Sequence, residues 1–284
     1  MLSFVNIWIA IPDSCISDEQ TKRDKTAKIS QFARACSIFR VKRIYIYHDK
    51  TQSSNRDDSI LLRTILEYLD TPQYLRRRIY PHTPELQYAG ILPPIKSPHH
   101  KKYEDIKRIR VGDIRVGVTV NVRGNLHVDL GLSTLVPYRC SSVREGQKVN
   151  VKINSPFPNL TITEATSDDI KNYYWGYEVK QVPNLHGLIT QNVGAKVMIT
   201  SKKGSYFKRI EKSLISCLKT VNNLLVVFGS PKSEVEEILY SEGEVITRPG
   251  FIVNMFPFQG TENVRVEEAI LGTLAVLNHT LSYN

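Results

Sequence analysis

Two strand–loop–helix units in tandem near the C-terminus constrain the fold more than any other feature of this sequence. The first has an apolar run over residues 224–228, which is broken at Gly229 and followed by a helix predicted from about Pro231. The second repeats this order, with an apolar run over 251–256 and a helix that Thr261 opens. Such units place their loops at the carboxyl ends of parallel strands, where open α/β sheets bind ligands.

The composition of these two loops limits the kind of ligand that they can bind. Neither loop carries a glycine-rich phosphate motif with its lysine, and no dinucleotide fingerprint follows an apolar run in this chain. Backbone amides and neutral hydrogen-bonding side chains remain, so a polar, roughly neutral ligand is favoured over a triphosphate. Gly229 and Gly260 would let the main chain approach that ligand closely. On pattern alone, two ordinary turns between strand and helix explain the loops equally well.

The flanking segments predict one α/β domain that is divided into two halves. In the N-terminal half, strands are expected at 4–11 and 41–47, and helices at 18–39 and 60–69. In the C-terminal half, a helix at 184–193 precedes a strand at 196–200, a loop at 201–204 and a helix at 211–219. Strands that alternate with helices at this spacing are typical of a parallel sheet flanked by helices. The α/β domain is therefore predicted to cover 1–90 and 172–284.

The segment between these halves has a different residue pattern. Three prolines follow Tyr88 within a short stretch, which marks a boundary, and from 106 to 165 the apolar residues alternate in short runs separated by Gly, Asn and Pro. About five short strands in such a span match the size of an OB-like barrel, which is a common oligonucleotide-binding fold. Residues 91–171 are therefore predicted to form an inserted all-β barrel that binds RNA.

Charge and cysteine content narrow the class of protein. The net charge is +10 and the isoelectric point is about 9.3, which favours an anionic partner, nucleic acid first. Cys15, Cys36, Cys140 and Cys217 lie far apart without histidines at ligand spacing, so neither a metal site nor a disulfide framework is expected. No stretch approaches the roughly 20 apolar residues of a membrane span, and the N-terminus lacks a basic leader. A cytoplasmic protein without a membrane partner is expected.

Several motifs, in the same order along nearly the whole chain, resemble one enzyme family. The segment NMFPFQGTENVRVEEAI at 254–270 resembles the C-terminal signature of the SPOUT class of RNA methyltransferases. More narrowly, it is similar to the archaeal and eukaryotic branch in which a β-barrel is inserted into the SPOUT domain. VMITSKKG, LLVVFG, YYWGYEV, KISQFARACSIFRVKRIYIYHD and YAGILPPIKSPHH resemble further segments of that branch. The resemblance implies a knotted parallel sheet flanked by helices, with an inserted OB-like barrel.

The same resemblance implies S-adenosyl-L-methionine (AdoMet) as the cofactor, held by three loops. Amides near Gly229 and Gly260 would contact it, and the amides that open the helix at Thr261 would hold its carboxylate. Thr261 is also a suitable structural N-cap. Carried over by position, the cofactor-binding residues are Thr200, Ser201, Lys203, Gly204, Phe228, Gly229, Ser230, Asn254, Pro257, Gln259, Gly260, Thr261 and Val264. Asn254 and Gln259 are singled out, since amide side chains beside Pro257 gain little from a purely structural role.

Methyl transfer to a ring nitrogen of uridine would need donors or cations that stabilise the nitrogen anion. Arg34 and Arg265 match family positions and are the candidates for this role. Solvated or salt-bridged helix residues remain the alternative for both arginines. Glu268, with Glu267, matches a pair of family glutamates and would act as a base or orient Arg265. Because each SPOUT site is completed by a partner's knot, the resemblance also implies a homodimer.

The inserted segment carries the predicted RNA-binding surface. Its first part is rich in Lys and Arg, which would bind the RNA backbone in a salt-dependent manner, although charge runs are often only solvated faces. The candidates are Lys96, Lys101, Lys102, Lys107, Arg108 and Arg110, with Arg76–Arg77–Arg78, Arg115 and Arg123 as further cations. The favoured function is methylation of a uridine, with N3 as the expected atom, in ribosomal RNA. The alternatives are a non-catalytic RNA-binding or assembly factor and, less favoured, a nucleotide-dependent α/β enzyme.

Overall fold

The computed structural model describes residues 5–52, 56–100, 108–139, 143–191, 194–243 and 250–282. The chain divides into two compact units. Unit 1 comprises Met1–Glu67, Glu85–Pro93 and Tyr177–Asn284, and unit 2 comprises Tyr68–Pro84 and Pro94–Gly176. Unit 1 is therefore discontinuous in the sequence, because the chain leaves it for unit 2 twice and returns each time.

Unit 1 is built on a parallel sheet. Within the described residues this sheet has six strands in the order β11-β9-β10-β1-β2-β8, and every neighbouring pair is parallel. The central strands β1 and β10 are mostly buried, as expected for parallel strands covered on both faces. The strands are β1 (Asn6–Pro12), β2 (Arg43–Tyr47), β8 (Glu178–Val182), β9 (Lys196–Tyr206), β10 (Asn223–Val227) and β11 (Phe251–Asn254).

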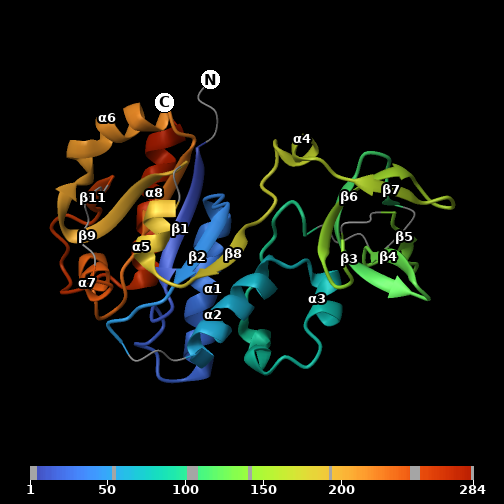
Figure 1. The fold of residues 1–284 in the computed structure, drawn as a ribbon, viewed down its shortest axis with the longest axis horizontal. Coiled ribbons are helices and arrows are strands. Elements are labelled where there is room, and N and C mark those ends of the chain that lie inside the picture. The colour runs from blue at the N-terminus through green and yellow to red at the C-terminus, as the bar shows by residue number, and fades with distance from the viewer. Residues whose placement is uncertain are drawn as a thin grey trace. The chain divides into compact units, whose positions relative to one another are not determined.

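Helices flank this sheet (Figure 1). They are α1 (Lys22–Ile38), α2 (Arg56–Asp70), α5 (Leu185–Gln191), α6 (Phe207–Leu218), α7 (Val235–Ser241) and α8 (Val266–Ser282), with short 3₁₀ turns at Pro84–Leu86 and Ala89–Ile91. Apolar side chains spaced three or four apart drive their packing, and Ile270, Leu274 and Leu277 of α8 are fully buried. The α/β prediction is confirmed, with six parallel strands where the sequence indicated alternating strands and helices.

One predicted loop is a strand in the structure. β9 runs through 201–204, which the sequence placed in a loop. The prediction was wrong because this part of β9 remains extended while it leaves the regular register with β11. Pairing jumps from Ile199–Ile252 to Ser205–Val253, so the residues between Ile199 and Ser205 bulge away from β11. At Gly204, a Cβ atom would lie 2.5 Å from the backbone nitrogen of Val253, so glycine permits the close approach of the two strands.

Unit 2 contains the inserted antiparallel barrel. Within the described residues its five strands follow the order β5-β4-β3-β6-β7, and the edge strands β5 and β7 contact each other, which nearly closes the barrel. This confirms the predicted all-β insert. The strands are β3 (Ile114–Val122), β4 (Asn125–Asp129), β5 (Val136–Pro137), β6 (Lys148–Ser155) and β7 (Thr161–Glu164), accompanied by α3 (Gln73–Ile79) and α4 (Ser167–Ile170).

Local sequence explains how the barrel closes. Arg123 and Gly124 both have positive φ angles, 51° and 83°, and they form the two-residue turn between β3 and β4. Val128, Leu130, Val151 and other buried side chains fill the interior. Across the described ranges, no helix has the length and apolar character needed to cross a membrane.

Candidate functional site

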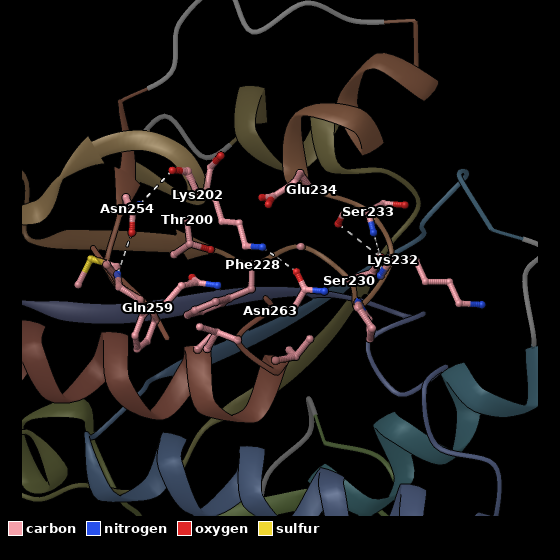
Figure 2. A pocket seen from close by; sticks show the side chains of 18 of the residues that line it. Thr200, Lys202, Phe228, Ser230, Lys232, Ser233, Glu234, Asn254, Gln259 and Asn263 are labelled. Carbon is pink, nitrogen blue, oxygen red and sulfur yellow. Dashed lines mark hydrogen bonds between the residues drawn. The ribbon is translucent and has the colours of Figure 1, made fainter. Parts of the chain in front are cut away.

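A cavity of about 300 Å³ lies in unit 1 beside the middle of β9 and the carboxyl ends of β10 and β11. Figure 2 shows its lining, which comes mainly from the middle of β9, the turn after β10, and the end of β11 with the loop that follows it. Eight of the predicted cofactor-binding residues line it: Thr200, Ser201, Phe228, Gly229, Ser230, Asn254, Gln259 and Val264. The tandem units at the C-terminus therefore do bring their loops to one place, as the strand order requires.

The first wall is the turn after β10. Gly229 is required there, because a Cβ atom at this position would lie 2.7 Å from the carbonyl oxygen of Ser233. The Oγ of Ser230 accepts a hydrogen bond from the N–H of Ser233 at 2.9 Å, and the N–H of Ser230 donates to the Ser233 carbonyl, also at 2.9 Å. This side-chain turn delays the start of α7 to Val235, so the helix predicted from Pro231 begins later.

The second wall is the bulged part of β9. The Oγ1 of Thr200 donates to the carbonyl oxygen of Val227 at 2.9 Å, which ties β9 to the end of β10. Ser201 is buried and accepts the N–H of Lys203. Lys202 reaches across the cavity rim, and its Nζ donates to Oδ1 of Asn263 at 2.7 Å. Of the two adjacent lysines in this segment, Lys202 lines the cavity and Lys203 does not.

The third wall is the loop between β11 and α8, where the two amide side chains have structural partners. Asn254 donates to the carbonyl oxygen of Lys202 at 3.0 Å and accepts the N–H of Phe256 at 2.9 Å. Gln259 donates to the carbonyl oxygens of Thr261 and Glu262, each at 2.9 Å. The expectation that these amides gain little from structural contacts is therefore wrong, since both shape the wall that they line.

The cavity is more strongly charged than the sequence suggested. Lys202, Lys232, Glu234 and Glu237 all line it. Burial, followed by repulsion from Glu236, raises the pKa of Glu234, and Lys202 partly offsets this rise. Sequence reasoning missed residues 232–234 because it placed them on a helix. The signal that could have found them is the Ser-Pro-x-Ser order after Gly229, which favours a turn.

Five predicted cofactor-binding residues do not line the cavity: Lys203, Gly204, Pro257, Gly260 and Thr261. Thr261 does not open a helix, because α8 begins at Val266. The first helical hydrogen bond runs from the N–H of Ala269 to the carbonyl of Arg265, and the Oγ1 of Thr261 donates instead to the carbonyl of Asn263. The predicted anion site at that helix start is therefore wrong.

The three predicted catalytic residues lie outside the cavity lining. Arg34 is exposed on α1. Arg265 is exposed at the N-terminus of α8, where its N–H donates to Oε2 of Glu268 at 2.9 Å. Glu268 thus caps the helix through the Arg265 backbone, and in the described contacts it does not hold the guanidinium. The neighbouring Glu267 is buried and forms an ion pair with Lys28 of α1 at 3.2 Å.

The loop after β2 contacts the turn that forms the first wall, a role that its polar composition alone did not indicate. Gln52 donates to Oγ of Ser230 at 3.1 Å, and the hydroxyls of Thr51 and Ser233 lie 2.8 Å apart. Both residues also bond to Asp49, which is fully buried. These contacts fix the turn after β10 in place.

The predicted RNA-binding residues belong to unit 2. Lys96, Arg108 and Arg110 are exposed there, whereas Lys101, Lys102 and Lys107 lie outside the described residues. Three of the additional cations, Arg76, Arg78 and Arg115, have partners within unit 2. Arg115 is buried with its guanidinium over the Tyr74 ring, because Nη2 donates to the carbonyl of Leu130 at 2.9 Å.

Two of the three arginines in the cluster Arg76–Arg77–Arg78 contact other residues of unit 2. Arg76 lies over the Tyr68 ring and donates to the carbonyl oxygens of Thr71 and Leu69. Arg78 forms an ion pair with Asp129 at 2.5 Å. Arg77 is exposed, and it alone of the three has no hydrogen bond or ion pair with the residues that the structure describes.

Comparisons with known proteins found relatives that are named as RNA methyltransferases. The chain is 29% identical over 301 residues to the mouse protein named 28S rRNA (uridine-N(3))-methyltransferase, covering 96% of this chain and 76% of the relative. The human protein of the same name is 27% identical, over 95% and 77% of the two chains. The fruit-fly protein of that name is 26% identical, and the match covers 96% of this chain but only 62% of the relative's length.

A family model described as "Putative RNA methyltransferase" matches residues 6–277, which include all of the parallel sheet, the barrel and the cavity. The match runs through both units rather than through one of them. By this match, the chain belongs to that family of RNA methyltransferases.

Proposed function

We propose that this protein is an AdoMet-dependent RNA methyltransferase of the SPOUT class that methylates N3 of a uridine in ribosomal RNA. The observation that carries the proposal is the cavity beside the middle of β9 and the ends of β10 and β11, with its mixed polar, charged and apolar lining. Membership in the methyltransferase family and the names of the mouse and human relatives support the substrate class.

The lining fits the chemistry of AdoMet. A volume of about 300 Å³ is within the usual range of small-molecule pockets, about 300–1,000 Å³. Phe228, Val264 and Val266 offer apolar surface for the adenine. Lys202 and Lys232 offer cations for the carboxylate, and Glu234 with Glu237 offers anions for the ammonium group and the ribose hydroxyls.

When bound, AdoMet would supply an electrophilic methyl group carried on a sulfonium. The protein's part is to hold the uridine in line with that group and to stabilise negative charge on N3 as its proton leaves. Arg265 is suited to this role, because its guanidinium is exposed at the N-terminus of α8, next to residues that line the cavity. Arg34 is the second cation that we assign to the uridine. Glu268 positions Arg265 through the backbone of the helix start.

A homodimer is part of the proposal. α1 and α8 pack against each other, and they expose Ile38, Leu271 and Val276, with exposures of 55%, 48% and 38%. A second copy of the chain would cover this apolar surface, and Arg34 on α1 would then lie close to that interface. The SPOUT resemblance also implies a knot at the C-terminal segment and a site that two copies share.

The test combines binding with chemistry. Calorimetry with AdoMet is expected to give one site per chain, and nucleosides from ribosomal RNA incubated with enzyme and AdoMet are expected to contain N3-methyluridine by mass spectrometry. Absence of binding heat together with retained RNA affinity would instead favour a non-catalytic RNA-binding factor. Replacement of Lys101, Lys102 and Lys107 by Ala should weaken RNA binding and lower the salt slope by about 0.7 per lost phosphate contact on a single strand.

A further inference from the structure

An unusual aromatic residue lies in the loop that forms the third wall of the cavity. Phe258 is 90% exposed, more than any other large apolar side chain in the described part of the chain. Its φ angle is +59°, in the left-handed region that bulky side chains rarely occupy. The loop therefore holds an apolar ring in water at some cost, directly between Phe256 and Gln259, which line the cavity.

Phe258 has an aromatic neighbour of its own. The ring of Tyr206, at the junction of β9 and α6, has its centroid 5.6 Å from that of Phe258, with an interplanar angle of 59°. The guanidinium of Arg209 lies over the Tyr206 ring, 5.3 Å from its centroid. An aromatic ring from the end of β9, one from the loop before α8 and a cation from α6 thus form one surface group, and most of the Phe258 ring remains open to solvent.

The charges around this group favour an anionic partner. The first turns of α6 expose Lys208, Arg209 and Lys212 against a single acid, Glu211, which pairs with Lys208 at 2.7 Å. Aromatic rings accompanied by cations are the combination that proteins use to bind single-stranded nucleic acid, because every base has a face that stacks and every nucleotide has a phosphate.

We propose that Phe258, Tyr206 and Arg209 form a stacking platform for an unpaired base of the RNA, beside the cavity. That the bound RNA is also the substrate rests on the function proposed above. The platform itself requires only that the protein binds RNA. A base stacked on Phe258 would sit next to the loop that lines the cavity. The platform would therefore hold a nucleotide that flanks the target uridine, and the substrate would have to be unpaired at that point.

The experiment measures binding of a fluorescein-labelled 12-residue oligouridylate to the full-length protein by anisotropy, without AdoMet. Phe258→Ala is expected to weaken binding by about 5- to 100-fold, the usual range for loss of one stacked base. Phe258→Trp should retain the affinity. Because stacking involves no phosphate, Phe258→Ala should leave the salt slope unchanged, whereas Arg209→Ala should lower it.

The matched control is Tyr240→Ala, which removes an aromatic side chain that is 80% exposed on α7 and does not line the cavity. Its affinity for the oligonucleotide should remain within twofold of the wild type. Three results would overturn the platform: an unchanged affinity of Phe258→Ala, an equal loss in Tyr240→Ala, or an effect of Phe258→Ala on self-association alone in sedimentation. Loss of RNA binding in Phe258→Ala supports the platform whether or not the wild-type protein binds AdoMet, so the two proposals can fail separately.

Discussion

Removing the charge of Lys28 should destabilise the protein more than any surface substitution. Lys28 lies on α1 with only 2% of its side chain exposed. Its Nζ is 2.6 Å from Asp18, and it is 3.2 Å from Oε2 of Glu267 on α8. The two carboxylates differ in their access to water, because Asp18 is 30% exposed and Glu267 only 8%. Lys28→Met keeps the apolar stem and removes the charge, so it isolates the electrostatic contribution.

The expected size of the effect follows from this difference in burial. Asp18 can be hydrated once the lysine charge is gone, whereas Glu267 would remain buried with the exposed Arg265 guanidinium, 3.9 Å away, as its remaining counter-charge. Breaking a buried ion pair by removing one partner costs about 3–5 kcal/mol. That is a large share of the roughly 5–15 kcal/mol by which a protein is stable. Adding Glu267→Gln to Lys28→Met neutralises the stranded carboxylate and should restore about 2 kcal/mol.

Urea unfolding followed by circular dichroism at pH 7 measures these differences. The control is Lys208→Met, which breaks an ion pair of similar length, 2.7 Å, in which the lysine is 89% exposed. It should change the free energy of unfolding by no more than about 0.5 kcal/mol. The reasoning would be refuted if Lys28→Met costs less than about 1 kcal/mol, or if the effects of Lys28→Met and Glu267→Gln simply add.

Two further predictions concern the cavity and the barrel. Gly229→Ala should lower AdoMet affinity at least about tenfold, because its Cβ would lie 2.7 Å from the Ser233 carbonyl oxygen. The matched control is Gly90→Ala, where no atom lies within 4 Å of the added Cβ. Equal AdoMet affinities of the two variants in calorimetry would contradict the assignment of Gly229 to the cofactor site. Burial raises the pKa of Tyr74, whose hydroxyl donates to the Val116 carbonyl, to about 12. The neutral phenol is therefore favoured in the folded state, and its stabilising contribution, complete below pH 10, should be lost as the pH rises toward 12. Tyr74→Phe should abolish that part of the alkaline loss, and a wild-type pH profile in the variant would argue against it.

The parallel sheet could be predicted from the sequence because its strands are buried on both faces. Runs such as 224–228 are continuously apolar, and a strand with two covered faces requires such a run. The barrel strands were recognised from the alternation of apolar and polar residues in the sequence, as along 114–122. Burial in β3 does not follow this alternation, because its first six residues are all buried and Val116 and Val118 pack with Leu75 of α3. Strand order, in contrast, depends on contacts between residues far apart in the chain, and composition alone does not contain it.

The parts of the candidate site that are formed by the backbone were easier to predict than those that depend on side-chain contacts. Gly229 follows from the end of β10. Thr200 and Ser201 were assigned by the family resemblance, and they lie within β9 beside the end of β10 because the two strands are parallel neighbours. The polar loop after β2 gave no comparable signal. Thr51 and Gln52 reach Ser233 and Ser230 across a large separation in sequence, and only the folded structure reveals such pairs.

The starts of α7 and α8 show why local propensity misjudged the chemistry of the cavity. Pro231 and Thr261 are both good residues for a first helical turn, yet each precedes its helix by several residues. Side-chain hydrogen bonds compete with the helix in both loops: Ser230 captures the N–H of Ser233, and Gln259 captures the carbonyls of Thr261 and Glu262. Because each helix begins later in the sequence than predicted, the loop before it is longer. Residues that were expected on a helix surface therefore line the cavity. Lys232 and Glu234 thereby become part of the wall, so the competition between side chain and helix determines the charge that a bound ligand meets.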